Sequence, residues 1–131
     1  MKISILGMGA YGIALSKVFY ENDNKVSMWT KFKDEEDIVK LKRENINLFP
    51  GVKIPRQIEI TSDLKKCVEN AKIIVIAVPM NAVRDVCKEL SGLIAKDQII
   101  CIASKGIETE TNKFMSDVVY EETNSENICM L

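Results

Sequence analysis

The start of the chain carries the pattern that most constrains its fold. An apolar run at residues 3–6 predicts a short buried strand. A G-x-G-x-x-G motif follows directly, with its glycines at Gly7, Gly9 and Gly12. Apolar residues then recur at helical spacing over residues 13–19. A strand, a glycine turn and a helix in this order are typical of a site where backbone N–H groups and a helix N-terminus bind the phosphates of a dinucleotide.

Each glycine of the motif is expected to have its own steric role. Gly7 permits the tight turn, Gly9 lets the backbone approach a pyrophosphate, and Gly12 lets the helix pack close to the strand. A glycine-rich turn with a purely structural role is the alternative interpretation, because glycines are common in turns. The strand before the motif and the helix after it favour the dinucleotide site.

The rest of the chain alternates strands with helices. The unbroken apolar run over residues 73–78 predicts a strand covered on both faces, as in a parallel sheet. This alternation predicts a Rossmann-type α/β fold, with a doubly wound, mainly parallel sheet and helices on both faces. Residues 1–131 are expected to form one dinucleotide-binding domain. The other expected strands cover residues 25–29, 58–60, 98–103 and 127–131.

Four further helices are expected between these strands, each with an apolar face toward the core. Three of them cover residues 37–45, 63–70 and 81–90, and Thr109 or Thr111 opens the fourth. Thr61 or Ser62 is expected to cap the helix over residues 63–70. The side chains expected to face inward are Ile38, Leu41, Leu64, Cys67, Val68, Val83, Val86, Cys87, Leu90, Phe114, Met115, Val118 and Val119.

Charge and residue types exclude several classes of function. The 18 lysines and arginines nearly balance the 19 acids, so no basic surface is expected to bind nucleic acid or an anionic membrane. No apolar run is long enough to span a membrane, and no signal peptide is expected. The chain has no histidine, which excludes Ser-His-Asp and Cys-His catalysis within it.

The four cysteines lack C-x-x-C spacing, and no histidine is present to share a metal with them. We therefore expect Cys67, Cys87, Cys101 and Cys129 to be small buried apolar residues, with no disulfide and no metal site. Free cysteines are typical of a reducing compartment, which predicts a cytoplasmic protein.

The residues after the second expected strand bear on the choice between NAD and NADP. An acid there accepts hydrogen bonds from the ribose of NAD, whereas a cation favours the 2′-phosphate of NADP. Thr30 and Lys31 come first, so the sequence favours NADP, although an exposed lysine is also commonly just solvated. The acids at residues 34–36 come later and are interpreted as complementing the dipole of a helix.

Polar and glycine-rich segments follow several of the expected strands. In a doubly wound sheet, ligands bind beyond the carboxyl ends of the strands. The residues at those ends are 7–12, 29–32, 78–80 and 104–106, so one edge of the sheet is the predicted site. A structural domain with an unused glycine turn does not explain this arrangement.

Five segments occur together in a distinctive order and spacing: residues 7–15, 29–31, 47–51, 77–79 and 104–108. Together they resemble the N-terminal dinucleotide-binding domain of bacterial-type NAD(P)-dependent glycerol-3-phosphate dehydrogenase. That family transfers a hydride between glycerol 3-phosphate and dihydroxyacetone phosphate. The resemblance implies NAD or NADP as cofactor and this small-molecule substrate as partner, with no nucleic acid and no membrane, and it leaves a homodimer open.

The resemblance also implies roles for particular residues. Lys105 corresponds to a lysine that contacts both cofactor and substrate, and Lys31 corresponds to an arginine near the 2′-phosphate. Met80 departs from the family, which commonly has a small polar residue there. No metal ligand is implied. The implied cofactor-binding residues are Gly7, Gly9, Ala10, Tyr11, Gly12, Thr30, Lys31, Pro79 and Lys105.

The family continues into a helical C-terminal domain that carries its catalytic lysine and most of its substrate pocket. The resemblance places this catalytic lysine beyond Leu131, the last residue of the sequence, so no catalytic residue is assigned among residues 1–131. We expect a truncated fragment that ends in a strand, binds the cofactor and is not catalytically complete.

Two other classes of protein stay open. Another Rossmann dehydrogenase, acting on ketopantoate, a hydroxyacid or a sugar nucleotide, would share the fold, and residues 104–108 favour glycerol 3-phosphate over these substrates. A non-catalytic nucleotide-sensing module commonly carries an acid at the end of its second strand. This chain has Thr30 and Lys31 at that position, which disfavours such a module.

Overall fold

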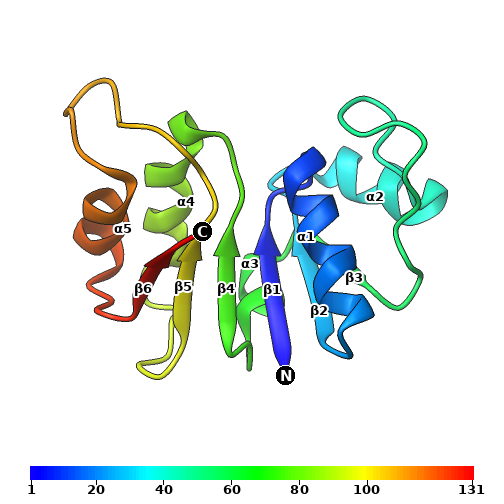
Figure 1. Ribbon diagram of the computed structural model, residues 1–131, viewed down its shortest axis with the longest axis horizontal. Coiled ribbons are helices and arrows are strands. Elements are labelled where there is room, and N and C mark those ends of the chain that lie inside the picture. Colours follow the sequence, from blue (N-terminus) through cyan, green and yellow to red (C-terminus); the bar gives the residue numbers. More distant parts are fainter.

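Six parallel strands form a single sheet in the computed structural model, which describes all of residues 1–131 (Figure 1). The strand order is β3-β2-β1-β4-β5-β6, so the chain winds outward in both directions from β1. The sequence predicted this doubly wound sheet, and the prediction is confirmed. The strands are β1 (Lys2–Leu6), β2 (Lys25–Trp29), β3 (Glu59–Thr61), β4 (Ile73–Ile76), β5 (Ile99–Ile102) and β6 (Ile128–Met130).

Helices cover both faces of the sheet because alternate strand residues point in opposite directions. Ile5 and Val75 pack into the apolar layer that contains residues of α1 and α2. Leu6 and Ile76 pack into the opposite layer, which contains residues of α3, α4 and α5. The helices are α1 (Ala10–Glu21), α2 (Lys33–Lys42), α3 (Leu64–Val68), α4 (Val83–Leu90) and α5 (Met115–Thr123), with a 3₁₀ turn η1 (Met80–Ala82).

The strand register brings the carboxyl ends of four strands to one level. Leu6 at the end of β1 pairs with Trp29 on one side and with Ile76 on the other. Ile76 in turn pairs with Ile102 of β5. The loops that leave these ends therefore meet at one edge of the sheet, where the sequence predicted the site.

The last strand is shorter than the sequence predicted. We expected a strand over residues 127–131, but β6 covers only Ile128–Met130, so Leu131 lies outside it. Leu131 is exposed, and its backbone N–H donates to the carbonyl oxygen of Ile102 at 2.9 Å. This bond follows the last paired residues of the two strands, Ile102 and Met130. β6 therefore ends one residue before the end of the strand expected over residues 127–131.

The prediction for the helix after β2 is wrong in its start and in its buried face. We expected a helix over residues 37–45 with Ile38 and Leu41 inward, but α2 begins at Lys33. Ile38 is 51% exposed and Leu41 is 81% exposed. Val39 and Glu36 are the residues that α2 buries.

A buried carboxylate explains this orientation of α2. Glu36 accepts a hydrogen bond from the backbone N–H of Ser62 at 2.9 Å, and it also pairs with Lys40 and Lys33. Burial by itself would raise the pKa of Glu36, but these partners outweigh burial and lower it to about 2. Glu36 therefore stays ionised and ties α2 to the segment that follows β3.

The predicted caps of α3 and α5 are also wrong. Asp63 caps α3, because its carboxylate accepts the backbone N–H of Lys66 at 3.0 Å. Thr61 instead accepts the N–H of Asp63, one step before the helix. α5 begins at Met115 and has Phe114 as its N-cap, so neither Thr109 nor Thr111 opens the helix. We expected Phe114 to face inward, but it is 64% exposed. The other residues expected to face inward on α3, α4 and α5 are buried, as predicted.

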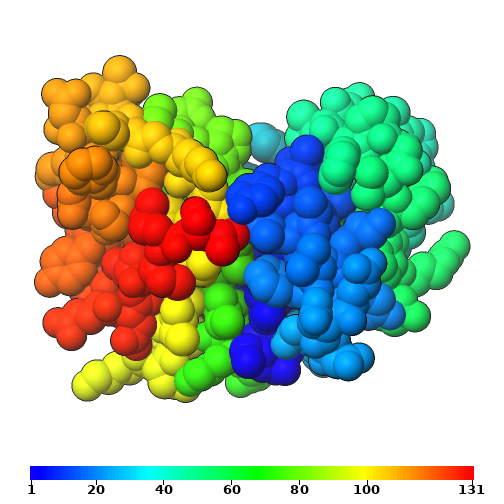
Figure 2. All heavy atoms as spheres, in the orientation of Figure 1, coloured from blue at the N-terminus to red at the C-terminus, as the bar shows by residue number.

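The cysteines follow the expectation only in part. Cys67 and Cys87 are buried, and burial raises the pKa of each thiol to about 12. Cys101 is half-buried, and Cys129 beside it in the register of β5 and β6 is exposed. Figure 2 shows the β6 residues, in red, uncovered on the face that it presents. None of the helices has both the length and the apolar character needed to cross a membrane.

Replacing Glu36 with alanine should lower the free energy of unfolding by about 1–3 kcal/mol, because the N–H of Ser62 loses its charged acceptor. Urea denaturation measures this loss. The contribution of Glu36 should be complete above pH 4.5, its ordinary pKa, and should disappear as the pH falls toward 2. Asp37→Ala is the control, since Asp37 is an exposed partner of Lys33 and should cost under about 0.5 kcal/mol. Equal losses in the two variants would contradict a special role for Glu36.

Candidate functional site

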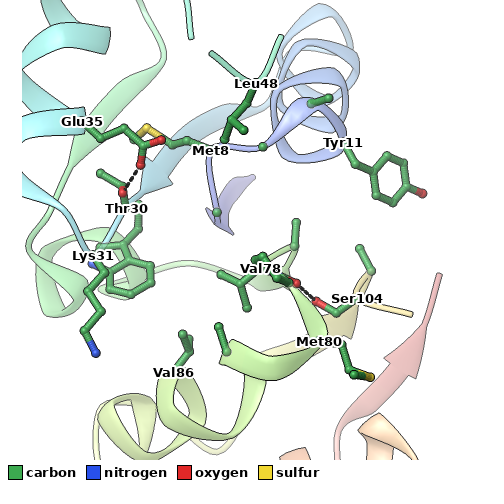
Figure 3. A pocket seen from close by; sticks show the side chains of 18 of the residues that line it. Met8, Tyr11, Thr30, Lys31, Glu35, Leu48, Val78, Met80, Val86 and Ser104 are labelled. Carbon is green, nitrogen blue, oxygen red and sulfur yellow. Dashed lines mark hydrogen bonds between the residues drawn. The ribbon is translucent and has the colours of Figure 1, made fainter. Parts of the chain in front are cut away.

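A cavity of about 670 Å³ lies at the carboxyl edge of the sheet (Figure 3). It is lined by the turn after β1, the end of β2, the segment after β4 and the segment after β5. Eight of the nine residues that the sequence analysis proposed for cofactor binding line it together, and Gly12 is buried behind them. These eight are Gly7, Gly9, Ala10, Tyr11, Thr30, Lys31, Pro79 and Lys105.

Two glycines of the turn are required by the packing of the protein itself. Gly7 has a φ of +122°, and a Cβ there would lie 2.6 Å from the carbonyl oxygen of Ala77. A Cβ on Gly12 would lie 2.5 Å from the carbonyl oxygen of Gly7. Gly7 thus lets the turn pass against the end of β4, and Gly12 lets α1 pack against that turn.

Gly9, in contrast, is not required by the packing of the protein itself. A Cβ on Gly9 would meet no atom within 4 Å, and its φ of −72° is one that any residue adopts. Gly9 borders the cavity, so its missing side chain leaves the backbone open to a ligand there. This is the arrangement that a close-lying phosphate requires.

The N-terminus of α1 is free to bind an anion. No side chain caps this helix, and its first turn contains no acidic residue. The first N–H groups of a helix have no partner within it, and they carry the positive end of the helix dipole. Ala10 and Tyr11 in this turn line the cavity, and Figure 3 shows the Tyr11 ring pointing outward from it. Together with Gly9, they form a turn whose N–H groups are suited to an anion such as a phosphate.

The first turn of α2 contributes a carboxylate that the sequence analysis did not assign to the site. Glu35 lines the cavity and is hydrogen-bonded to the hydroxyl of Thr30. It also accepts a bond from the Asn45 side chain at 3.0 Å, and Asn45 donates to the carbonyl oxygen of Met8 at 2.8 Å. The early start of α2 at Lys33 would have indicated this position, because it places Glu35 in the first turn of the helix that follows β2.

Lys31 lies at the same end of the cavity but already has a partner. Its ammonium is 2.8 Å from a carboxylate oxygen of Glu89 on α4, and this hydrogen bond raises the pKa of Lys31. Both side chains are exposed, so the pair is easily exchanged for another partner. In Figure 3 the Lys31 side chain extends away from Thr30 and Glu35.

The opposite wall of the cavity is the segment that carries Lys105. Ser104 is buried, and its hydroxyl donates to the carbonyl oxygen of Val78 at 2.5 Å. Lys105 is exposed at the cavity edge. Gly106 follows with a φ of +118°, and a Cβ on it would lie 2.8 Å from the sulfur of Met80. Met80 therefore packs closely against the segment that presents Lys105.

Comparison with known proteins gives this geometry a family. The family model described as the N-terminus of NAD-dependent glycerol-3-phosphate dehydrogenase matches residues 2–131. The chain belongs to this family. This membership disfavours the alternative dehydrogenase classes and the nucleotide-sensing module.

Individual relatives agree with the family assignment. A glycerol-3-phosphate dehydrogenase [NAD(P)+] of Fusobacterium nucleatum is 38% identical over 127 residues, which are 97% of this chain and 38% of that protein. One of Thermoanaerobacter is 39% identical over 121 residues, which are 92% of this chain and 36% of that protein. A solved glycerol-3-phosphate dehydrogenase from Coxiella burnetii superposes with a TM-score of 0.88 at 28% identity, covering 98% of this chain and 39% of that one. The chain thus spans little more than a third of the length of these relatives.

Gly12→Ala should destabilise the fold by about 1–3 kcal/mol, because its Cβ would overlap the carbonyl oxygen of Gly7. Gly9→Ala is the matched control and should change stability by less than about 0.5 kcal/mol, since its Cβ meets nothing. Urea midpoints of the two variants and the parent chain test this difference. A Gly12→Ala variant as stable as the parent would contradict the close packing of α1 on the turn.

Proposed function

We propose that residues 1–131 form the cofactor-binding part of an NAD(P)-dependent glycerol-3-phosphate dehydrogenase. The observation that carries the proposal is Gly9, a glycine that the protein's own packing does not require, beside an uncapped helix N-terminus. Family membership supports the reaction and the substrate pair, glycerol 3-phosphate and dihydroxyacetone phosphate.

The residues that line the cavity fit a dinucleotide. The backbone N–H groups of the turn at Gly9, Ala10 and Tyr11 would hold its phosphates, and Thr30 lies where one ribose would bind. Pro79 on the far wall would contact the other half of the molecule. When bound, the dinucleotide supplies the hydride acceptor for the alcohol or the hydride donor for the ketone.

Lys105 is the residue proposed to meet both cofactor and substrate. Its ammonium at the cavity edge is suited to a substrate phosphate or to a carbonyl oxygen that gains negative charge. For residues 1–131 we propose only this contact and cofactor binding, because the chain spans 38% of the length of the Fusobacterium relative. Leu131 does not line the cavity, and a catalytic lysine beyond it stays a prediction from the family resemblance. Homodimerisation and a cytoplasmic location stay predictions from the sequence.

Two residues of opposite charge bear on the choice between NAD and NADP. Lys31 would attract the 2′-phosphate of NADP once it leaves Glu89. Glu35 would accept a hydrogen bond from the 2′-hydroxyl of NAD and repel a phosphate. We propose that these opposing residues allow both cofactors to bind, with Lys31 favouring NADP.

Gly9→Ala should weaken binding of NADH and NADPH about tenfold or more while leaving the fold intact, because the added methyl group occupies the approach of the phosphates. Titration followed by the fluorescence of the reduced cofactor measures this. An unchanged affinity in Gly9→Ala would contradict a phosphate site at this turn, and a parent chain that binds neither cofactor would contradict the proposed function.

Lys31→Ala should weaken NADPH about three- to tenfold and leave NADH nearly unchanged, because only NADPH carries the 2′-phosphate. Glu35→Gln should shift the preference further toward NADPH, since it removes a negative charge from the cavity wall. Lys33→Ala is the control, because this neighbouring lysine pairs with Glu36 and Asp37 and does not line the cavity. Equal effects of Lys31→Ala and Lys33→Ala would contradict the role of Lys31.

A further inference from the structure

Arg84 on α4 is bonded to three carboxylates outside the cavity. Its Nε and Nη2 donate to the two carboxylate oxygens of Glu108 at 2.8 and 2.7 Å. Its Nη1 donates to Glu122 at 2.6 Å, and its Nη2 also lies 3.1 Å from Glu121. Glu121 and Glu122 belong to α5, whereas Glu108 belongs to the loop that carries Lys105.

The Arg84–Glu108 contact has the geometry of a strong pair. Two parallel N–H···O bonds fix the planar guanidinium against the carboxylate, which a single ammonium contact would not do. The Glu108 side chain is only 12% exposed. Hydrogen bonds from Arg84 and Thr111 hold the pKa of Glu108 down to about 2, so it is ionised at neutral pH.

The loop after β5 is held on both sides of Lys105. Before Lys105, the buried hydroxyl of Ser104 is bonded to Val78. After it, Glu108 is bonded to Arg84 by its side chain and to the carbonyl oxygen of Lys113 by its N–H, at 2.9 Å. Lys105 is thus an exposed residue on a segment whose two ends are fixed.

Docking of α5 on α4 does not require the bond to Glu108. Arg84 already reaches α5 through Glu121 and Glu122, and the two helices share buried apolar residues such as Val86 and Val118. The two hydrogen bonds from Arg84 to Glu108, here called the Arg84–Glu108 fork, attach the loop after β5 to these two helices. The contact of Arg84 with α5 and its contact with the loop can therefore be separated by substitution.

We propose that Arg84 and Glu108 are positioning residues that hold the Lys105 loop at the edge of the cavity and so strengthen ligand binding through Lys105. The inference rests on the proposed function, because it takes the bound dinucleotide as the ligand. A fixed backbone leaves Lys105 with less freedom to lose when it meets the ligand. Neither Arg84 nor Glu108 lines the cavity, so their effect is indirect.

A double-mutant cycle on NADPH affinity tests this coupling. Lys105→Met and Glu108→Gln should each weaken binding about three- to tenfold, and the double variant should be no weaker than Lys105→Met alone. Arg84→Lys should behave like Glu108→Gln, because an ammonium cannot form the two-bonded fork. Glu122→Gln, which removes another bond of Arg84 but leaves the loop tethered, should bind like the parent.

The outcomes separate this inference from the proposed function. If the parent binds NADPH and the effects of Lys105→Met and Glu108→Gln multiply in the double variant, the positioning role is overturned and the proposed function stands. If the parent binds neither cofactor, the proposed function fails. Amide hydrogen exchange of residues 105–113 then tests whether Arg84 and Glu108 hold the loop in place. Faster exchange of these residues in Glu108→Gln, with parent-like exchange in Glu122→Gln, supports the positioning role. Unchanged exchange in both variants overturns it.

Discussion

The site depends on one backbone contact, where the turn after β1 passes against the end of β4. At Gly7 and Gly12 no side chain fits, because carbonyl oxygens lie 2.6 and 2.5 Å from where a Cβ would be. This contact sets α1 directly on the sheet with its unpaired N–H groups at the cavity. The position of this turn is therefore a property of the packing. Gly9 is the one of the three glycines whose missing side chain the packing does not require.

Two adjacent acids on α2 show how one helix orientation provides both an anchor and a site residue. Glu36 is buried and tied to the N–H of Ser62, which holds α2 against the segment after β3. Successive helix residues point about 100° apart, so the same rotation turns Glu35 toward the cavity. There Thr30 and Asn45 hold its carboxylate in place. A carboxylate thus stands at the end of β2 although the residues directly after that strand are Thr30 and Lys31.

The two walls of the cavity are built by different means. The turn at Gly9 is part of the sheet and helix packing and needs no charged residue to hold it. The segment with Lys105 is a loop, and it is held by polar contacts at Ser104 and by the Arg84–Glu108 fork. Backbone packing thus fixes the wall at Gly9, whereas hydrogen bonds and an ion pair fix the wall at Lys105.

The sequence by itself determined the strand–turn–helix unit, the parallel sheet and the apolar faces of α4, because glycine spacing and apolar periodicity are local signals. It also indicated which segments meet at the cavity, since parallel strands end at one edge. Only the tertiary structure decided the buried face of α2 and the partner of Lys31. Ser62 and Glu89 lie far along the chain from the residues they bind, and no local pattern records such pairs. Glu36 turned inward because a distant N–H and neighbouring ammonium groups compensate its burial, which periodicity of apolar residues cannot show.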